Sequence, residues 1–227
     1  MNENKTSVNY RFWHEYYPSA KKEFIKSLPI EVRKFHVQET KEMKKLIKAG
    51  RRYLFVGCGD GREVEPLKNR KIKVCGIDYV KGVVDEFNSK FKNYSNFTAK
   101  LAYAQNLPFQ NYFFDGAFLL YNNLGVLGDK IKLLKEIYRV IRKNAFLFGT
   151  VYNENARVIQ INSYKGLNMK YLKHDYKSVT VITSNGITYT SERFSRKELE
   201  RLFKKIDVEV KISSLTKYSY MYTMIKI

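Results

Sequence analysis

Short apolar runs alternate with amphipathic stretches over most of the chain, and the two patterns predict different elements. Continuous apolar runs are typical of strands buried on both faces of a sheet. They predict strands near 53–57, 72–77, 97–103, 113–120 and 145–152. Apolar residues at helical spacing predict helices from about 61, near 80–91 and over 129–142. This alternation of strand and helix predicts a parallel sheet.

The segment before this alternation and the segment after it have patterns of their own. Residues 10–49 are predicted to form two helices ahead of the sheet. The first is broken at Pro18 and carries Tyr10, Phe12, Trp13, Tyr16 and Tyr17. We expect this segment to cover the functional site. Near the other end, β-rich runs over 179–183 and 187–190 flank Asn185-Gly186, a residue pair suited to a tight turn. They predict a small lid hairpin.

The last part of the chain is predicted to form a helix and two strands. Ser195 and Glu198 have the spacing of a capping box, and strands are expected over 208–214 and 218–227. The elements together predict an α/β fold: a doubly wound, mostly parallel seven-stranded sheet with N-terminal helices and a small hairpin-containing lid insertion. A single domain of 227 residues with 44% hydrophobic residues can furnish such a core.

Glycines follow the first predicted strand at alternate positions. Gly57, Gly59 and Gly61 come directly after the run from Tyr53, and a second run ends at Asp78, 21 residues after Gly57. Glycine lets the backbone turn sharply and approach a ligand. Because neighbouring parallel strands end at one edge, Asp78 is expected beside this loop, where a carboxylate can accept both hydroxyl protons of a ribose. The pattern predicts a nucleoside-cofactor site.

The spacing of the glycines then indicates which kind of cofactor fits. A dinucleotide fingerprint has the form G-x-G-x-x-G, but here the third glycine comes one residue early and Arg62 stands in its place. A P-loop ends in Lys-Ser or Lys-Thr, whereas this loop continues with Asp60 and Glu63, whose carboxylates would repel phosphate. The loop therefore favours a cofactor without phosphate.

These residues resemble the class I S-adenosylmethionine-dependent methyltransferases, whose first motif commonly has the form V-L-D-V-G-C-G-x-G. Further blocks follow in family order: Ala104–Phe109 beside the adenine, Phe114–Phe118 opening the fourth strand, and Glu136–Ile141 in the next helix. The resemblance covers roughly residues 50–153 and implies a Rossmann-like core that binds S-adenosyl-L-methionine. The cofactor-binding residues that it implies are Gly57, Cys58, Gly59, Asp60, Gly61, Asp78, Tyr79, Gln105, Asn106, Leu107, Tyr121 and Asn122.

The chain departs from the family pattern at three places. Phe55 replaces the usual acid before the first glycine, Tyr103 replaces the Asp of the adenine segment, and Asn144-Ala145 replaces a Pro-Gly turn. Asp60 or Glu63 is a candidate to bind the methionine amino group instead, and Tyr103 or Gln105 a candidate to contact the adenine. A cofactor-binding homologue without catalysis is therefore an alternative.

We therefore predict a single domain over residues 1–227. Its parts are an N-terminal helical cap (1–49), a cofactor-binding core (50–153), a lid insertion (154–192) and a final helix with strands (193–227). Candidate catalytic residues are Tyr121 after the fourth strand, His14, and Glu154 after the fifth strand. The plainer alternatives are a structural histidine and a solvated loop carboxylate.

The predicted function is transfer of a methyl group to an O or N atom of a small molecule. Tyrosines expected around the cleft can hold an aromatic or cationic acceptor, although a tyrosine more often belongs to the core or the surface: Tyr16, Tyr17, Tyr121, Tyr152 and Tyr164. No Asp/Asn-Pro-Pro-aromatic motif follows the fourth strand, which disfavours methylation of adenine N6. Both cysteines lie in apolar runs of the inferred core, which disfavours cytosine C5 chemistry.

The charge of +20 raises RNA, most plausibly tRNA, as an alternative acceptor. The densest basic cluster flanks Met43, Leu46 and Ile47 at helical spacing, so the solvated face of an amphipathic helix is its simplest explanation and an RNA-binding face the alternative. The cluster comprises Lys41, Lys44, Lys45, Lys48, Arg51 and Arg52.

Cys58 and Cys75 are expected to be reduced, with no metal site. No apolar run suits a bilayer and the start lacks a signal-peptide core, so we expect a cytoplasmic protein without membrane contact. The oligomeric state stays open.

Overall fold

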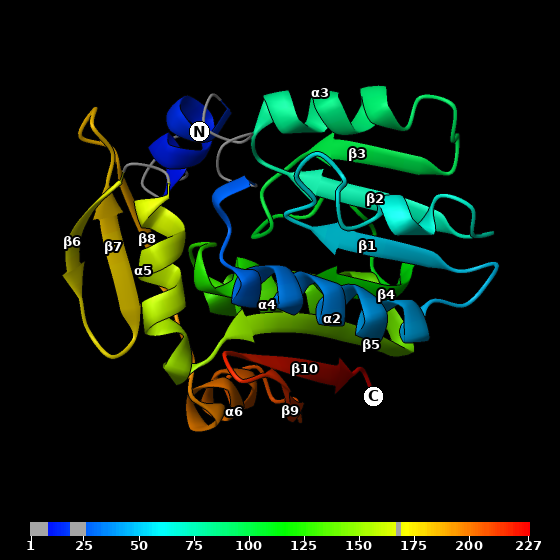
Figure 1. Ribbon diagram of the computed structural model, residues 1–227. Coiled ribbons are helices and arrows are strands. Elements are labelled where there is room, and N and C mark those ends of the chain that lie inside the picture. Colours follow the sequence, from blue (N-terminus) through cyan, green and yellow to red (C-terminus); the bar gives the residue numbers. More distant parts are fainter. Residues whose placement is uncertain (1–8, 19–25, 167–168) are drawn as a thin grey trace.

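The computed structural model describes residues 9–18, 26–166 and 169–227. Its centre is a seven-stranded sheet in the order β3-β2-β1-β4-β5-β10-β9 (Figure 1). The strands are β1 (Arg52–Val56), β2 (Lys73–Asp78), β3 (Phe97–Leu101), β4 (Phe114–Leu119), β5 (Ile141–Tyr152), β9 (Lys211–Thr216) and β10 (Ser219–Ile225). Strands β1 to β5 pair in parallel, and β10 runs antiparallel to both β5 and β9. The predicted mostly parallel, seven-stranded, doubly wound sheet is confirmed.

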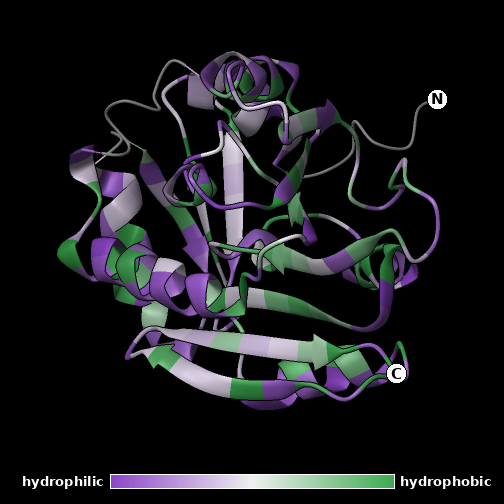
Figure 2. Ribbon diagram, turned by 90° about the vertical axis from the view of Figure 1, so that its right-hand side faces the viewer, coloured by the Kyte–Doolittle hydropathy of each residue, from purple (hydrophilic) through white to green (hydrophobic). Residues whose placement is uncertain are grey.

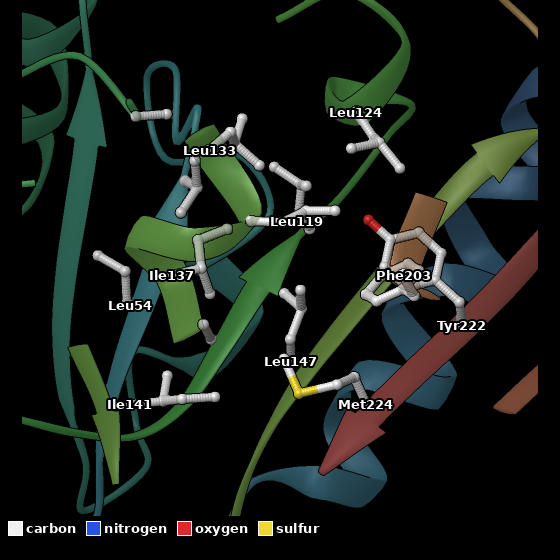
Figure 3. Close-up of a cluster of buried hydrophobic side chains, with 14 of the residues drawn as sticks. Leu54, Leu119, Leu124, Leu133, Ile137, Ile141, Leu147, Phe203, Tyr222 and Met224 are labelled. Atoms are coloured by element: carbon white, nitrogen blue, oxygen red, sulfur yellow. The ribbon is translucent and has the colours of Figure 1, made fainter. Parts of the chain in front are cut away.

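Helices cover both faces of this sheet because the buried strands present apolar side chains on each side. One face packs against α4 (Lys130–Val140) and α6 (Arg196–Lys204), through residues such as Ile137 and Phe203 (Figure 3). The other face packs against α2 (Ile30–Leu46) and α3 (Lys81–Lys90), through residues such as Met43 and Phe87. Hydrophilic and hydrophobic residues alternate along the helices in Figure 2, as in amphipathic helices.

The predicted capping box begins α6. The Ser195 hydroxyl accepts the N–H of Glu198, and the Glu198 carboxylate accepts the N–H of Ser195. The basic cluster around α2 also has the predicted form, because Met43 and Ile47 are buried while Lys41 and Lys48 are exposed.

A second, three-stranded antiparallel sheet contains β6 (Lys170–His174), β7 (Ser178–Ile182) and β8 (Thr188–Glu192). Strands β7 and β8 form the predicted hairpin across Asn185-Gly186, where Gly186 has φ +76°. Sequence reasoning missed two neighbouring elements, β6 and the helix α5 (Arg157–Lys165). All five residues of β6 are exposed, so the strand has no alternation of buried and exposed positions to find.

The helix expected from about residue 61 is absent among the described residues. The chain instead forms turns and a short 3₁₀ helix, η2 (Glu65–Leu67), before β2. Pro66 explains the difference, because a proline inside a helix lacks the N–H donor and clashes with the carbonyl four residues earlier. Gly61 instead packs against α3, where an added Cβ would lie 2.5 Å from the Phe91 ring.

The N-terminal helical cap is described only in part, since residues 1–8 and 19–25 of the predicted 1–49 segment lie outside the described residues. Residues 10–18 are helical and include a π-helical turn, η1 (Phe12–Tyr16). This turn and α5 flank the three-stranded sheet, where Phe12 packs against Tyr189 with ring centroids 4.3 Å apart (Figure 1). Two further 3₁₀ helices, η3 (Asn123–Gly125) and η4 (Glu154–Ala156), follow β4 and β5.

Candidate cofactor and acceptor site

The glycine loop lies where the strand order reverses. From β1 the chain passes outward to β2 and β3 and then returns to β4 on the other side of β1. In open α/β sheets, ligands bind at the carboxyl ends of the strands at such a point. Gly57, Gly59 and Gly61 have φ of +66°, +50° and +80°, a region that favours glycine. The N–H groups of Gly57 and Cys58 both donate to the Ile77 carbonyl, which ties the loop to the end of β2.

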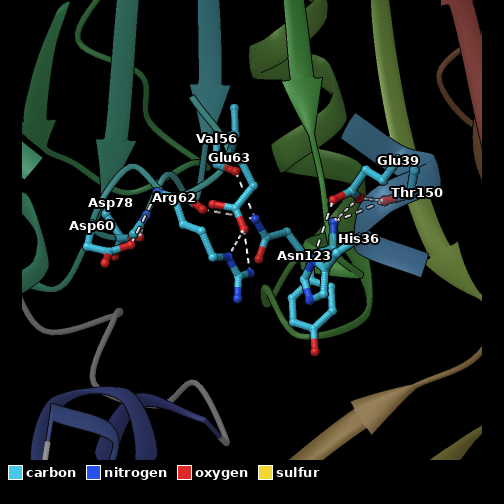
Figure 4. Close-up of polar contacts among 12 residues, drawn as sticks. His36, Glu39, Val56, Asp60, Arg62, Glu63, Asp78, Asn123 and Thr150 are labelled. Carbon is cyan, nitrogen blue, oxygen red and sulfur yellow. Dashed lines mark hydrogen bonds and ion pairs between the residues drawn. The ribbon is translucent and has the colours of Figure 1, made fainter. Parts of the chain in front are cut away.

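Asp78 lies beside this loop, as its position at the end of β2 predicts. Its Oδ2 accepts the N–H of Gly59 at 3.0 Å, and its Oδ1 accepts the N–H of Val80 at 3.0 Å (Figure 4). Burial raises the pKa of this carboxyl, and the N–H donors of Val80 and Gly59 oppose the shift. No cation pairs with Asp78 among the described residues, so each oxygen keeps a lone pair for a further donor. That is the donor–acceptor chemistry that the two hydroxyls of a ribose require.

A pocket opens between the loop, Asp78 and the end of β4. Several residues implied by the family resemblance line it: Gly57, Cys58, Gly59, Asp60, Asp78, Tyr79 and Tyr121. Trp13 and Tyr17 line it from the N-terminal segment, and Arg62, Glu63 and Asn123 complete the polar part of the wall. The wall contains no described residue of the predicted lid insertion (154–192). The β7–β8 hairpin instead packs against the N-terminal segment that lines the pocket, since the ring centroids of Tyr189 and Trp13 are 5.6 Å apart.

The remaining residues implied by the resemblance lie off this wall. Gly61 packs on α3, and the segment before β4 holds Gln105, the exposed Asn106 and the buried Leu107. The N–H of Leu107 donates to the Glu136 carboxylate at 2.8 Å, which fixes the segment to α4. Tyr103, which replaces the family's Asp, stacks with Tyr79 at 5.8 Å.

The loop after β4 contains two asparagines with opposite orientations. Asn122 is buried and faces the hairpin, where its Nδ2 donates to Ser191 Oγ and the Glu192 carbonyl. Asn123 faces the glycine loop, where its Nδ2 donates to the carbonyls of Val56 and Gly57 at 3.0 and 3.1 Å (Figure 4). An added Cβ at Gly57 would lie 2.6 Å from this amide nitrogen. Sequence reasoning selected Asn122 and missed Asn123, since nothing in the motif shows which of the pair faces the loop.

Tyr121 is held by aromatic and charged neighbours. The His36 ring stacks on it with centroids 3.9 Å apart, and the Arg62 guanidinium lies 5.4 Å from its centroid. Arg62 also donates to Glu63 Oε1 at 2.9 and 2.5 Å. Burial and then the charge of Arg62 lower the pKa of His36 well below its usual value. Burial raises the pKa of Tyr121, so its phenol stays protonated near neutral pH and can serve as a hydrogen-bond donor.

A buried glutamate of α2 fixes the backbone behind Tyr121. Glu39 Oε1 accepts the Tyr121 N–H at 2.7 Å and also the Thr150 hydroxyl of β5, while its Oε2 lies 3.9 Å from His36 Nδ1 (Figure 4). The residue is 1% exposed, and burial raises its pKa to about 7. Sequence reasoning missed Glu39, because one acid in a charged amphipathic helix gives no sign of its burial.

The other two candidate catalytic residues lie off the pocket wall. His14 stacks on Tyr10 at 4.1 Å and lies 5.5 Å from Tyr79, and burial lowers its pKa. Glu154 accepts the Tyr220 hydroxyl at 3.1 Å and borders a different groove. Two of the predicted acceptor-site tyrosines, Tyr152 and Tyr164, belong to the core that supports the N-terminal wall.

The first two departures from the family pattern lie in and beside the pocket, and the third lies within β5. Phe55 lines the pocket and stacks on Phe118 at 4.8 Å, so this position supplies apolar surface and no carboxylate. Asn144 has φ +61° and its N–H donates to the Lys226 carbonyl. Asparagine tolerates this left-handed backbone better than most residues, which explains how β5 accommodates this irregular position without a glycine.

Comparison with known proteins agrees with this geometry. Residues 54–149 match the family described as a methyltransferase domain. The chain is 29% identical over 202 residues to an uncharacterised protein of Methanocaldococcus jannaschii, and the match covers 86% of this chain and 76% of that protein.

Two solved methyltransferase structures have the same fold. One, from Thermotoga maritima, is described as a possible histamine N-methyltransferase and has a TM-score of 0.65 at 18% identity, covering 97% of this chain and all (100%) of that one. The other is phosphoethanolamine N-methyltransferase 2 of Haemonchus contortus with S-adenosyl-L-methionine, with a TM-score of 0.62 at 13% identity, covering 83% of this chain and 52% of that one. Residues 54–149 therefore resemble a methyltransferase domain, and the chain shares the fold of these two methyltransferases.

Within the described residues, no group of three or more His, Cys, Asp or Glu side chains is arranged to hold a metal ion. The described helices also include none that is long and apolar enough to cross a membrane.

Proposed function

We propose that this chain binds S-adenosyl-L-methionine between the glycine loop and Asp78, and transfers its methyl group to an O or N atom of a small molecule. The observation that carries the proposal is the composition of one pocket. A carboxylate suited to a ribose, the glycine loop, and aromatic side chains from the N-terminal segment all line it.

Each side of the pocket has a role in cofactor binding under this proposal. Asp78 accepts the ribose hydroxyls, and Tyr79 and Val80 provide apolar surface for the adenine beside it. Phe55 cannot bind the methionine ammonium, so Asp60 and Glu63 are the carboxylates on the wall that can. Both already contact a cation, since Glu63 accepts from Arg62 and Asp60 Oδ2 lies 3.7 Å from Lys90 Nζ, so the two remain equal candidates.

The bound cofactor would supply a sulfonium methyl group, which an incoming lone pair displaces in line. The chain's own task is to align the acceptor and exclude water. Tyr121 at the end of β4, with Trp13 and Tyr17 opposite, forms ring surfaces suited to an aromatic or cationic acceptor. The Tyr121 hydroxyl can hold an acceptor oxygen or nitrogen as a hydrogen-bond donor. Because burial raises its pKa, the phenol stays protonated near neutral pH and is not available as a base, so an amine acceptor would have to reach the pocket already neutral.

Labelled methyl transfer tests the acceptor class. The full chain would be incubated with methyl-labelled S-adenosyl-L-methionine and either a metabolite extract or total RNA, and products identified by mass spectrometry. We expect label in a small molecule. Label in RNA alone would replace this proposal with RNA methylation, and cofactor binding without any label in either would indicate a non-catalytic homologue.

A further inference from the structure

A second, larger groove lies between the β6–β7 hairpin turn and α6, apart from the cofactor pocket. Its lining comes from the start of α4, the turn after β6 and one side of α6. None of its lining residues belongs to the wall of the cofactor pocket. The proposed methyl transfer therefore does not explain why the groove exists.

The acids in the groove are already engaged. Glu192 pairs with Lys130 at 2.6 Å, and Glu198 pairs with Lys177 at 3.1 Å. Asp175 accepts backbone N–H groups within its own turn, and Glu154 accepts the Tyr220 hydroxyl. The seven Lys and Arg side chains of the lining outnumber its four acids, so the basic side chains outside these two ion pairs keep the groove positive.

Those basic side chains form a row. Lys197, Arg201 and Lys205 are spaced four residues apart along α6 and its C-cap, so they lie on one helix face about 6 Å apart along the axis. All three are exposed, and across the described residues none of them forms an ion pair. Arg157 at the start of α5 adds a fourth unpaired cation to the groove. A row of charges suits a chain of anions better than a single phosphate.

An exposed aromatic residue borders this row. Tyr176 lines the groove and is 77% exposed, so burial does not account for it. Its turn is held in place by Arg193, whose guanidinium donates to the carbonyls of Asp175 and Ser178 at 2.5 and 3.3 Å. The ring is therefore presented on a fixed turn beside the cations, with Lys177 Nζ 5.4 Å from its centroid.

We propose that this groove binds single-stranded nucleic acid, with phosphates along Lys197, Arg201 and Lys205 and a base stacked on Tyr176. Proteins that bind single strands without sequence preference combine a positive groove with an aromatic stacking surface. An acidic peptide would use the cations but would have no need of an exposed ring beside them. The net charge of +20 favours approach of any such polyanion.

Binding of a fluorescein-labelled oligouridine of about twelve nucleotides tests this assignment, measured by anisotropy from low to moderate salt. The triple variant Lys197→Gln, Arg201→Gln, Lys205→Gln should bind at least about tenfold more weakly at low salt, and its salt slope should fall by about 2, since each lost phosphate contact removes about 0.7. Tyr176→Ala should weaken binding at least about fivefold, whereas Tyr176→Phe keeps the ring and should bind like the wild type.

The matched control removes the same charge from another face, through Lys41→Gln, Lys44→Gln and Lys48→Gln on and just after α2. Equal loss in both triple variants, or no loss in the α6 variant, would overturn the assignment. Unchanged circular dichroism would show that each variant is folded. Because the readout is binding and not methyl transfer, failure here is distinct from failure of the proposed function.

Discussion

Glu39 accepts a hydrogen bond from the backbone N–H of Tyr121, with the two atoms 2.7 Å apart. The contact joins a helix at the N-terminal end of the chain to the end of β4, 82 residues away in sequence. Since Tyr121 lines the pocket, Glu39 positions this part of the pocket wall without lining the pocket itself.

This buried carboxyl should make stability depend on pH. Its pKa is about 7 in the folded chain and near 4.5 when exposed, so the folded state binds more protons between these values. Stability should therefore fall as pH rises through this window. Glu39→Gln keeps an acceptor for the Tyr121 N–H and cannot ionise. From pH 5 to 8, the wild type should lose about 2.5 kcal/mol more unfolding free energy than this variant.

Urea unfolding at several pH values gives the comparison directly, because all other titrating groups are common to both proteins. Parallel pH profiles of wild type and Glu39→Gln would mean that Glu39 is not protonated in the folded chain. Glu39→Ala would confuse the comparison, since it also leaves the Tyr121 N–H without its buried acceptor.

Asn123 should hold the glycine loop in its binding conformation. Asn123→Ala removes two hydrogen bonds to the carbonyls of Val56 and Gly57, and we expect S-adenosylhomocysteine to bind about tenfold more weakly. Asn123→Asp should be worse than alanine, because it places a carboxylate against the same two carbonyl oxygens. Calorimetry with S-adenosylhomocysteine measures both. Equal affinity in all three proteins would show that the loop holds its shape alone.

The N-terminal wall should control the acceptor more than the cofactor. Trp13 lines the pocket but is distant in sequence from the glycine loop, so Trp13→Ala should lower label transfer to a metabolite extract at least about tenfold through lost packing and water exclusion. Affinity for S-adenosylhomocysteine should stay within about threefold. Trp13→Phe, which keeps a ring, serves as the matched variant. A parallel loss of transfer and affinity would assign Trp13 to the cofactor side.

The sequence was informative where one local rule decides the structure. Apolar runs identified the parallel strands. The glycines and Asp78 located the edge of the sheet where the carboxyl ends of these strands lie, because left-handed turns at strand ends favour glycine. The capping box at Ser195 was visible for the same reason.

Other features depend on contacts between distant segments and leave no local pattern. The helix expected after the loop did not form, because Pro66 opposes it, and the π-helical turn that carries Trp13 has no sequence signature. Glu39 became part of the site only because α2 packs over the ends of β4 and β5. The catalytic roles suggested for Tyr121, His14 and Glu154 stay predictions, and Tyr121 alone of the three lines the pocket.

The central claim is that Asp78 and the glycine loop bind S-adenosyl-L-methionine, and isothermal calorimetry of S-adenosylhomocysteine tests it most directly. The wild type should bind, and Asp78→Ala should lose about 1.5–3 kcal/mol, the usual contribution of hydrogen bonds to a charged group. Asp78→Asn retains one acceptor oxygen and should lose less. NAD should bind more weakly than S-adenosylhomocysteine. Absence of binding at millimolar S-adenosylhomocysteine, or unchanged affinity in Asp78→Ala, would contradict the account.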